Sequence, residues 1–227
     1  MNALPITLFR VATALLLVGL QCLSAAHAQE SACGSFENNY GPYDYRTDRD
    51  RLPIVDKHHF FDSVRALTFK TDGSGTLAGH LQYVLRAFPN HHPALVATVR
   101  YGQRMKSRKP PEFDYSIDCY FERALRFRRD DYIARLLFAD YLGKTGRVNE
   151  AVEQIPYAKN LAKDNPLTQY SIGMLYFELG RYDEALMQAH EAMAMGVDNP
   201  DLKNRLTSVN RWIEPKPPAA AAHAASQ

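Results

Sequence analysis

One segment of the chain repeats at a fixed offset, and this limits the possible folds more than any other sequence feature. Ten residues starting at Leu142 align without a gap to ten residues starting at Tyr176, an offset of 34 residues. Glycine, arginine, glutamate and alanine recur in phase, and Ala158 and Ala192 keep the same offset. A period of this length is typical of chains built from stacked supersecondary units, in which each unit contacts its neighbours.

The later copy has the pattern of two antiparallel helices joined by a glycine turn. Helical spacing predicts the first helix over about Leu167–Leu179. Gly180 follows it, where helix termination favours a left-handed residue that glycine adopts without a Cβ penalty. A second helix is expected from about Asp183, with small residues such as Ala185 against its partner. The repeat therefore predicts an all-α fold of helical hairpins.

Residues at fixed places in this hairpin resemble the tetratricopeptide repeat (TPR) family. Its pattern of large apolar, small, aromatic, turn-glycine and paired alanine positions is met by Ile172, Gly173, Tyr176, Gly180, Tyr182, Ala185 and Ala192. The preceding copy meets it with Phe138, Ala139, Leu142, Gly146, Val148, Ala151 and Ala158. The chain also resembles uncharacterised exported bacterial TPR proteins. The resemblance covers about residues 75–212 and implies a right-handed helical-hairpin solenoid with an irregular N-terminal arm and a C-terminal capping helix.

These signals divide the chain into segments. We expect a signal peptide at 1–28, an irregular aromatic-rich arm at 29–74, and a capping helix, half a repeat, at 75–91. Repeats follow at 92–131, with a lengthened turn, at 132–165 and at 166–199. A capping helix at 200–213 and a disordered Pro/Ala tail at 214–227 complete the division. Pro156 falls inside a predicted helix, which we expect it to kink or shorten.

The first 28 residues predict export. Arg10 precedes an apolar run from Val11 to Leu20, and Ala26-His27-Ala28 forms the small-x-small pattern of a signal-peptidase site. An apolar run of about ten residues is too short to span a bilayer, which requires about 20. We therefore expect a cleaved signal peptide, no membrane insertion after cleavage and a periplasmic location, with secretion as the alternative.

Cleavage would leave two cysteines, Cys33 and Cys119. Two cysteines in an exported chain favour one disulfide. The bridge would join the N-terminal arm to the repeat region across 86 residues. The alternative is a pair of unbonded thiols, one of them buried.

The net charge and the absence of common catalytic motifs argue against nucleic-acid binding and against several classes of enzyme. The chain has 27 Lys and Arg against 25 Asp and Glu, and its formal net charge of +2 is too small for the basic surface typical of nucleic-acid-binding proteins. The sequence lacks the common motifs for haem attachment, zinc proteases, serine nucleophiles and phosphate loops. We therefore predict no nucleic-acid partner, no cofactor, no metal and no catalytic residues.

Two histidine doublets, His58-His59 and His91-His92, are the candidates for metal chemistry. Helical metal sites commonly use histidines four residues apart, because those positions share a face. Adjacent residues point about 100° apart on a helix, so a structural or surface role is favoured. A metal-binding or enzymatic accessory protein that uses His58 and His59 stays open as the alternative.

The family resemblance implies a binding surface on the first helix of each hairpin, which lines a concave groove in TPR proteins. The positions carried over to this chain are Arg100, Arg104, Leu136, Asp140, Lys144, Tyr170, Met174 and Phe177. They run from basic to aromatic, which suits a peptide or protein segment with an acidic end and an apolar end. We expect a scaffold or adaptor in envelope assembly or export. The alternative is a structural protein whose groove is filled by its own arm.

Overall fold

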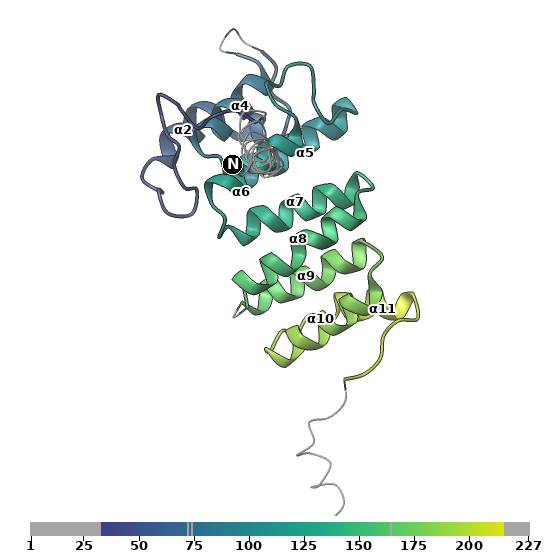
Figure 1. The fold of residues 1–227 in the computed structure, drawn as a ribbon. Helices are drawn as coiled ribbons and strands as arrows, with labels where there is room; N and C mark the ends of the chain where they lie inside the picture. Colours follow the sequence, from purple (N-terminus) through teal and green to yellow (C-terminus); the bar gives the residue numbers. More distant parts are fainter. Residues whose placement is uncertain (1–32, 72, 74, 164, 216–227) are drawn as a thin grey trace, which may run out of the picture. The chain divides into compact units, whose positions relative to one another are not determined.

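The structure, a computed structural model, describes residues 33–71, 73, 75–163 and 165–215. Within these residues all regular structure is helical, in ten helices labelled α2 to α11, which confirms the all-α fold class (Figure 1). The described chain forms two compact units, the first ending at Arg126 and the second beginning at Phe127. The expected signal peptide and nearly all of the expected disordered tail lie outside the described residues.

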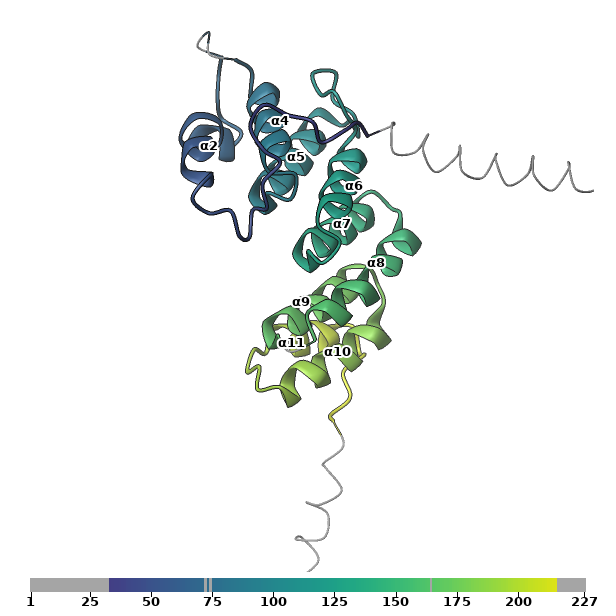
Figure 2. The same ribbon diagram turned by 60° about the vertical axis from the view of Figure 1, so that its left-hand side comes forward.

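The first unit is built around α4 and α5. Its helices are α2 (Leu52–His59), α3 (Asp62–Arg65), α4 (Leu77–Ala87), α5 (His92–Met105) and α6 (Ile117–Phe127), of which only the last residue of α6 falls in the second unit. Helix α2 packs against α4 (Figure 2), and the short helix α3 packs against both α4 and α5. Helices α2 and α3 lie in the segment at 29–74, so the expectation of a wholly irregular arm is wrong. These short helices form because each buries one valine, Val55 in α2 and Val64 in α3.

The start of the arm is fixed to α6 by a covalent bond and by an arginine. The structure contains the expected disulfide between Cys33 and Cys119. The Arg123 guanidinium donates to the carbonyl oxygens of Cys33 and Ser35, at 2.8 and 2.7 Å. It also lies over the ring of Phe36, 4.9 Å from the ring centroid. Cys33 and Ser35 lie outside any helix or strand, so Arg123 supplies the hydrogen bonds that their backbone carbonyls require.

A buried carboxylate joins the arm to the turn between α4 and α5. Asp44 is 2% exposed and accepts hydrogen bonds from the side chains of Asn90 and Arg46, both at 2.8 Å. The side-chain oxygen of Asn90 accepts in turn from the backbone N–H of Tyr45, at 3.0 Å. A buried charge is tolerated because it is paired and hydrogen-bonded in this way.

The second unit consists of two helical hairpins and a final helix. Its helices are α7 (Tyr132–Lys144), α8 (Val148–Leu161), α9 (Pro166–Glu178), α10 (Tyr182–Ala194) and α11 (Asp201–Ser208). α7 packs with α8, α9 packs with α10, and α11 packs against both α9 and α10 (Figure 1). Gly146 and Gly180 end the first helix of each hairpin with φ of +80° and +72°. α8 continues through Pro156 to Leu161, so the proline does not shorten it.

Close packing at Gly102 in α5 leads to a stability prediction. A methyl group there would lie 2.2 Å from Cδ1 of Ile117 and 2.8 Å from the carbonyl oxygen of Ser107. We expect Gly102→Ala to lower the free energy of unfolding by about 1–3 kcal/mol, because overpacking displaces neighbouring groups. The control is Gly79→Ala in α4, where the nearest atom, Oγ1 of Thr76, is 3.4 Å away. Urea denaturation of both variants measures the difference, and equal stabilities would contradict the close approach.

Candidate functional site

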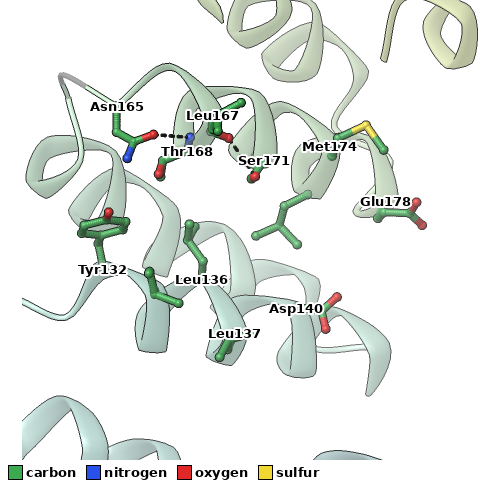
Figure 3. A pocket seen from close by; sticks show the side chains of 12 residues that line it. Tyr132, Leu136, Leu137, Asp140, Asn165, Leu167, Thr168, Ser171, Met174 and Glu178 are labelled. Atoms are coloured by element: carbon green, nitrogen blue, oxygen red, sulfur yellow. Dashed lines mark hydrogen bonds between the residues drawn. The ribbon is translucent and has the colours of Figure 1, made fainter. Parts of the chain in front are cut away.

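An apolar groove lies between α7 and α9 in the second unit, with a volume of about 550 Å³ (Figure 3). Its apolar lining comprises Ile133, Leu136 and Leu137 from α7, and Leu167, Met174 and Leu175 from α9. Leu167 is 70% exposed and Ile133 is 40% exposed. Large apolar side chains that remain exposed together typically mark a binding surface.

Two helix caps place the walls of the groove in register. Asp131 caps the start of α7, and Asn165 caps α9 by accepting a hydrogen bond from the backbone N–H of Thr168. A cap fixes where a helix begins, and hence which face each later residue occupies. Ile133 and Leu167 therefore hold equivalent positions in α7 and α9, both on the groove.

Asp140 and Glu178 lie at one end of the groove, opposite the end formed by Tyr132 and Asn165 (Figure 3). The Asp140 carboxylate accepts from Lys144 at 2.6 Å, and the Glu178 carboxylate accepts from Arg205 at 2.9 Å. Both ion pairs are partly exposed, and such pairs contribute only about 0–1 kcal/mol each. An incoming cation can therefore exchange with Lys144 or Arg205 at little cost. The groove is apolar along its length and acidic at one end.

The structure brings only some of the sequence-predicted groove residues together. Leu136, Asp140 and Met174 line the groove, and Lys144 lies beside it through its bond to Asp140. Tyr170 and Phe177 are not among the lining residues; they pack against a buried cluster of Ala185, Ala189, Leu202 and Leu206. Burial raises the pKa of the Tyr170 hydroxyl. These two aromatic residues share a helix face that meets α10 and α11, so they contribute to the core.

Arg100 and Arg104 belong to α5 in the first unit. Arg100 is exposed, whereas Arg104 donates a hydrogen bond of 2.6 Å to the carbonyl oxygen of Leu67, just beyond α3. The arm therefore engages one predicted groove residue within its own unit. All the residues that line the α7–α9 groove belong to the second unit.

His91 has a structural environment. It is 1% exposed, and its Nδ1 accepts a hydrogen bond from the backbone N–H of Ala94, which caps α5. Its Nε2 lies 3.3 Å from a carboxylate oxygen of Asp56 in α2. Burial lowers the pKa of His91, and the bond to Asp56 partly offsets that effect.

His59 pairs with a histidine that sequence reasoning did not single out. Its Nδ1 lies 3.2 Å from Nδ1 of His80 in α4, whereas His58 beside it is exposed. The doublet His58-His59 therefore does not act as a unit. The pairing of His59 with His80 is a contact between two helices, and residue spacing along one helix cannot predict such a contact.

Cys33, Cys119 and Glu122 are the one group of three potential metal ligands found among the described residues. A carboxylate oxygen of Glu122 lies 3.1 Å from Sγ of Cys33. Cysteine binds metals as the thiolate, and both sulfurs here are bonded to each other. We therefore assign no metal to this group in the oxidised protein.

In the part of the chain that the structure describes, no helix has both the length and the apolar character needed to cross a membrane. No protein-family model matches the chain, and no curated protein was found to match it.

Proposed function

We propose that this protein is a periplasmic interaction module of the TPR type. It binds an apolar peptide or protein segment in the groove between α7 and α9, and Asp140 and Glu178 receive a basic side chain of that segment. The observation that carries the proposal is the groove itself, an apolar lining on two helices that is exposed at Ile133 and Leu167 and ends in two carboxylates. Helical solenoids commonly present extended binding surfaces of this kind.

The proposed partner differs from the sequence-based expectation. That expectation combined an acidic end of the partner, facing Arg100 and Arg104, with an apolar end facing Tyr170 and Phe177. The α7–α9 groove instead has the carboxylates of Asp140 and Glu178 at its polar end, each in a partly exposed ion pair with Lys144 or Arg205. A partner that carries Lys or Arg next to apolar residues is therefore the better complement.

Other features support the remaining parts of the proposal. Hairpins α7–α8 and α9–α10 follow the 34-residue offset, which supports the TPR assignment. The buried Cys33–Cys119 disulfide is consistent with an oxidising compartment. The periplasm is such a compartment, so the disulfide supports the proposed location. The Ser171 hydroxyl in the groove donates within α9 to the carbonyl oxygen of Leu167, which favours a binding role over nucleophilic catalysis by this serine. A serine nucleophile requires an adjacent general base instead.

A charge placed in the groove tests the proposal. We expect Leu167→Glu to weaken partner binding at least about tenfold, because the carboxylate would be desolvated against apolar surface. Its fold should be unaffected, since Leu167 is 70% exposed. The matched control is Met187→Glu in α10, where the side chain is 60% exposed and lies outside the groove. Selection from a displayed peptide library, followed by calorimetric titration of the selected peptides, measures both effects.

The expected result is a set of peptides rich in apolar residues with one Lys or Arg, bound by wild type and by Met187→Glu but not by Leu167→Glu. Replacing the peptide's basic residue by alanine should weaken binding to wild type and leave binding to Asp140→Asn/Glu178→Gln unchanged. Equal binding by Leu167→Glu and Met187→Glu would refute the groove assignment.

A further inference from the structure

Two imidazole rings from separate helices face each other in the first unit. His59 is the last residue of α2, and His80 lies in the first turns of α4. Their Nδ1 atoms are 3.2 Å apart. In the neutral pair one Nδ1 carries a proton and the other accepts it, so a single proton lies between the two nitrogens.

Aromatic neighbours hold both rings in this orientation. The His59 ring stacks on Tyr83, with 3.7 Å between ring centroids. His80 is 5% exposed and makes T-shaped ring contacts with Phe61 and Phe69, at centroid distances of 5.4 and 4.9 Å. Rings that are fixed by packing need little reorganisation to bind a ligand between them.

The spacing of the two nitrogens matches that of two ligands on one metal ion. Imidazole nitrogens bind Zn²⁺ at about 2.0–2.1 Å, and two of them in a tetrahedral site are about 3.3 Å apart. We propose that His59 and His80 form a two-imidazole site for a divalent cation of the zinc class, bound through both Nδ1 atoms. The shared proton moves to Nε2 of its own ring on binding, so both imidazoles coordinate in their neutral form.

A cavity borders the His59 side of the pair. The cavity has a volume of about 210 Å³ and is lined by His58, His59, Tyr40 and Tyr83 among others. Burial and the neighbouring His80 lower the pKa of His59. Imidazole ligands favour zinc-class cations over Mg²⁺ and Ca²⁺, which prefer oxygen.

Zinc titration of the purified protein tests the site. Calorimetry with ZnCl₂ should show one bound ion per chain at pH 7.5, and MgCl₂ should show none. His59→Gln and His80→Gln should each weaken zinc binding at least about tenfold, whereas His58→Gln, in the same cavity, should leave it unchanged. Co²⁺ provides an independent readout, because a tetrahedral site with two nitrogen ligands gives visible d–d absorption that His59→Gln should abolish.

These measurements decide whether His59 and His80 bind zinc. Far-UV circular dichroism without metal checks the fold of each variant, and if His80→Gln unfolds, the half-buried His59→Gln decides alone. Zinc binding that survives His59→Gln would overturn the proposal. Absence of zinc binding by wild type would also overturn it and leave the pair as a hydrogen bond. Neither result bears on the peptide groove, which lies in the other unit.

Discussion

Cys33→Ala/Cys119→Ala is expected to lower the free energy of unfolding of the first unit by about 4–5 kcal/mol. The bridge closes a loop of 86 residues, and a link of that length removes much conformational entropy from the unfolded chain. The loss is large against the total stability of a small domain, about 5–15 kcal/mol. Guanidinium denaturation of the variant and of wild type measures the difference.

Reduction provides the control for this experiment. Wild type with its disulfide reduced should match the double variant, because both lack the cross-link. The side-chain contacts of Arg123 to the arm should remain in both. Stability equal to that of oxidised wild type would show that the bridge does not constrain the unfolded chain.

Asp44→Ala should lower the free energy of unfolding by about 3 kcal/mol, near the lower end of the range for breaking a buried ion pair. The carboxylate is 2% exposed and is hydrogen-bonded to both Arg46 and Asn90. Its removal takes away the hydrogen bond of 2.8 Å that the Asn90 side chain donates to it. The Arg46 side chain is 27% exposed, so water can partly solvate its charge and limit the loss.

The matched control is Asp50→Ala, six residues further along the arm. Asp50 pairs with Arg51 at 3.2 Å, but its side chain is 75% exposed, and such a pair contributes about 0–1 kcal/mol. Thermal unfolding of both variants at one pH compares the two sites. A similar shift in melting temperature for both would contradict the role assigned to the buried network.

The helices of the second unit could be predicted from the sequence because their signals are local. Helical spacing predicted a helix over Leu167–Leu179, and α9 spans Pro166–Glu178. Gly180 adopts the left-handed conformation that its place after the helix requires. Such signals depend on residues a few positions apart and not on the rest of the fold.

The side on which each groove residue lies could not be predicted in the same way. Periodicity places Tyr170 and Phe177 on one face of α9, but it does not say which neighbour that face meets. In the structure Tyr170, Phe177 and Met174 all pack against the buried cluster, and of the three only Met174 also lines the groove. Family position alone was therefore a poor guide to solvent exposure.

Contacts between distant segments of the chain also could not be predicted from the sequence. Asp44 and Asn90 are 46 residues apart, and His59 and His80 are 21 apart. Neither pair leaves a periodic or local pattern, because each depends on how the arm packs against α4 and α5. The Cys33–Cys119 pair was different, since only two cysteines remain after the expected cleavage.

That disulfide also bears on how the protein matures. Both of its sulfurs precede Phe127, where the second unit begins, and no cysteine follows Cys119 in the sequence. A chain that emerges from its N-terminus therefore presents the whole cross-link before the first residue of the groove appears. Oxidation has one wrong partner to avoid, Cys22, and removal of the expected signal peptide would take that partner away.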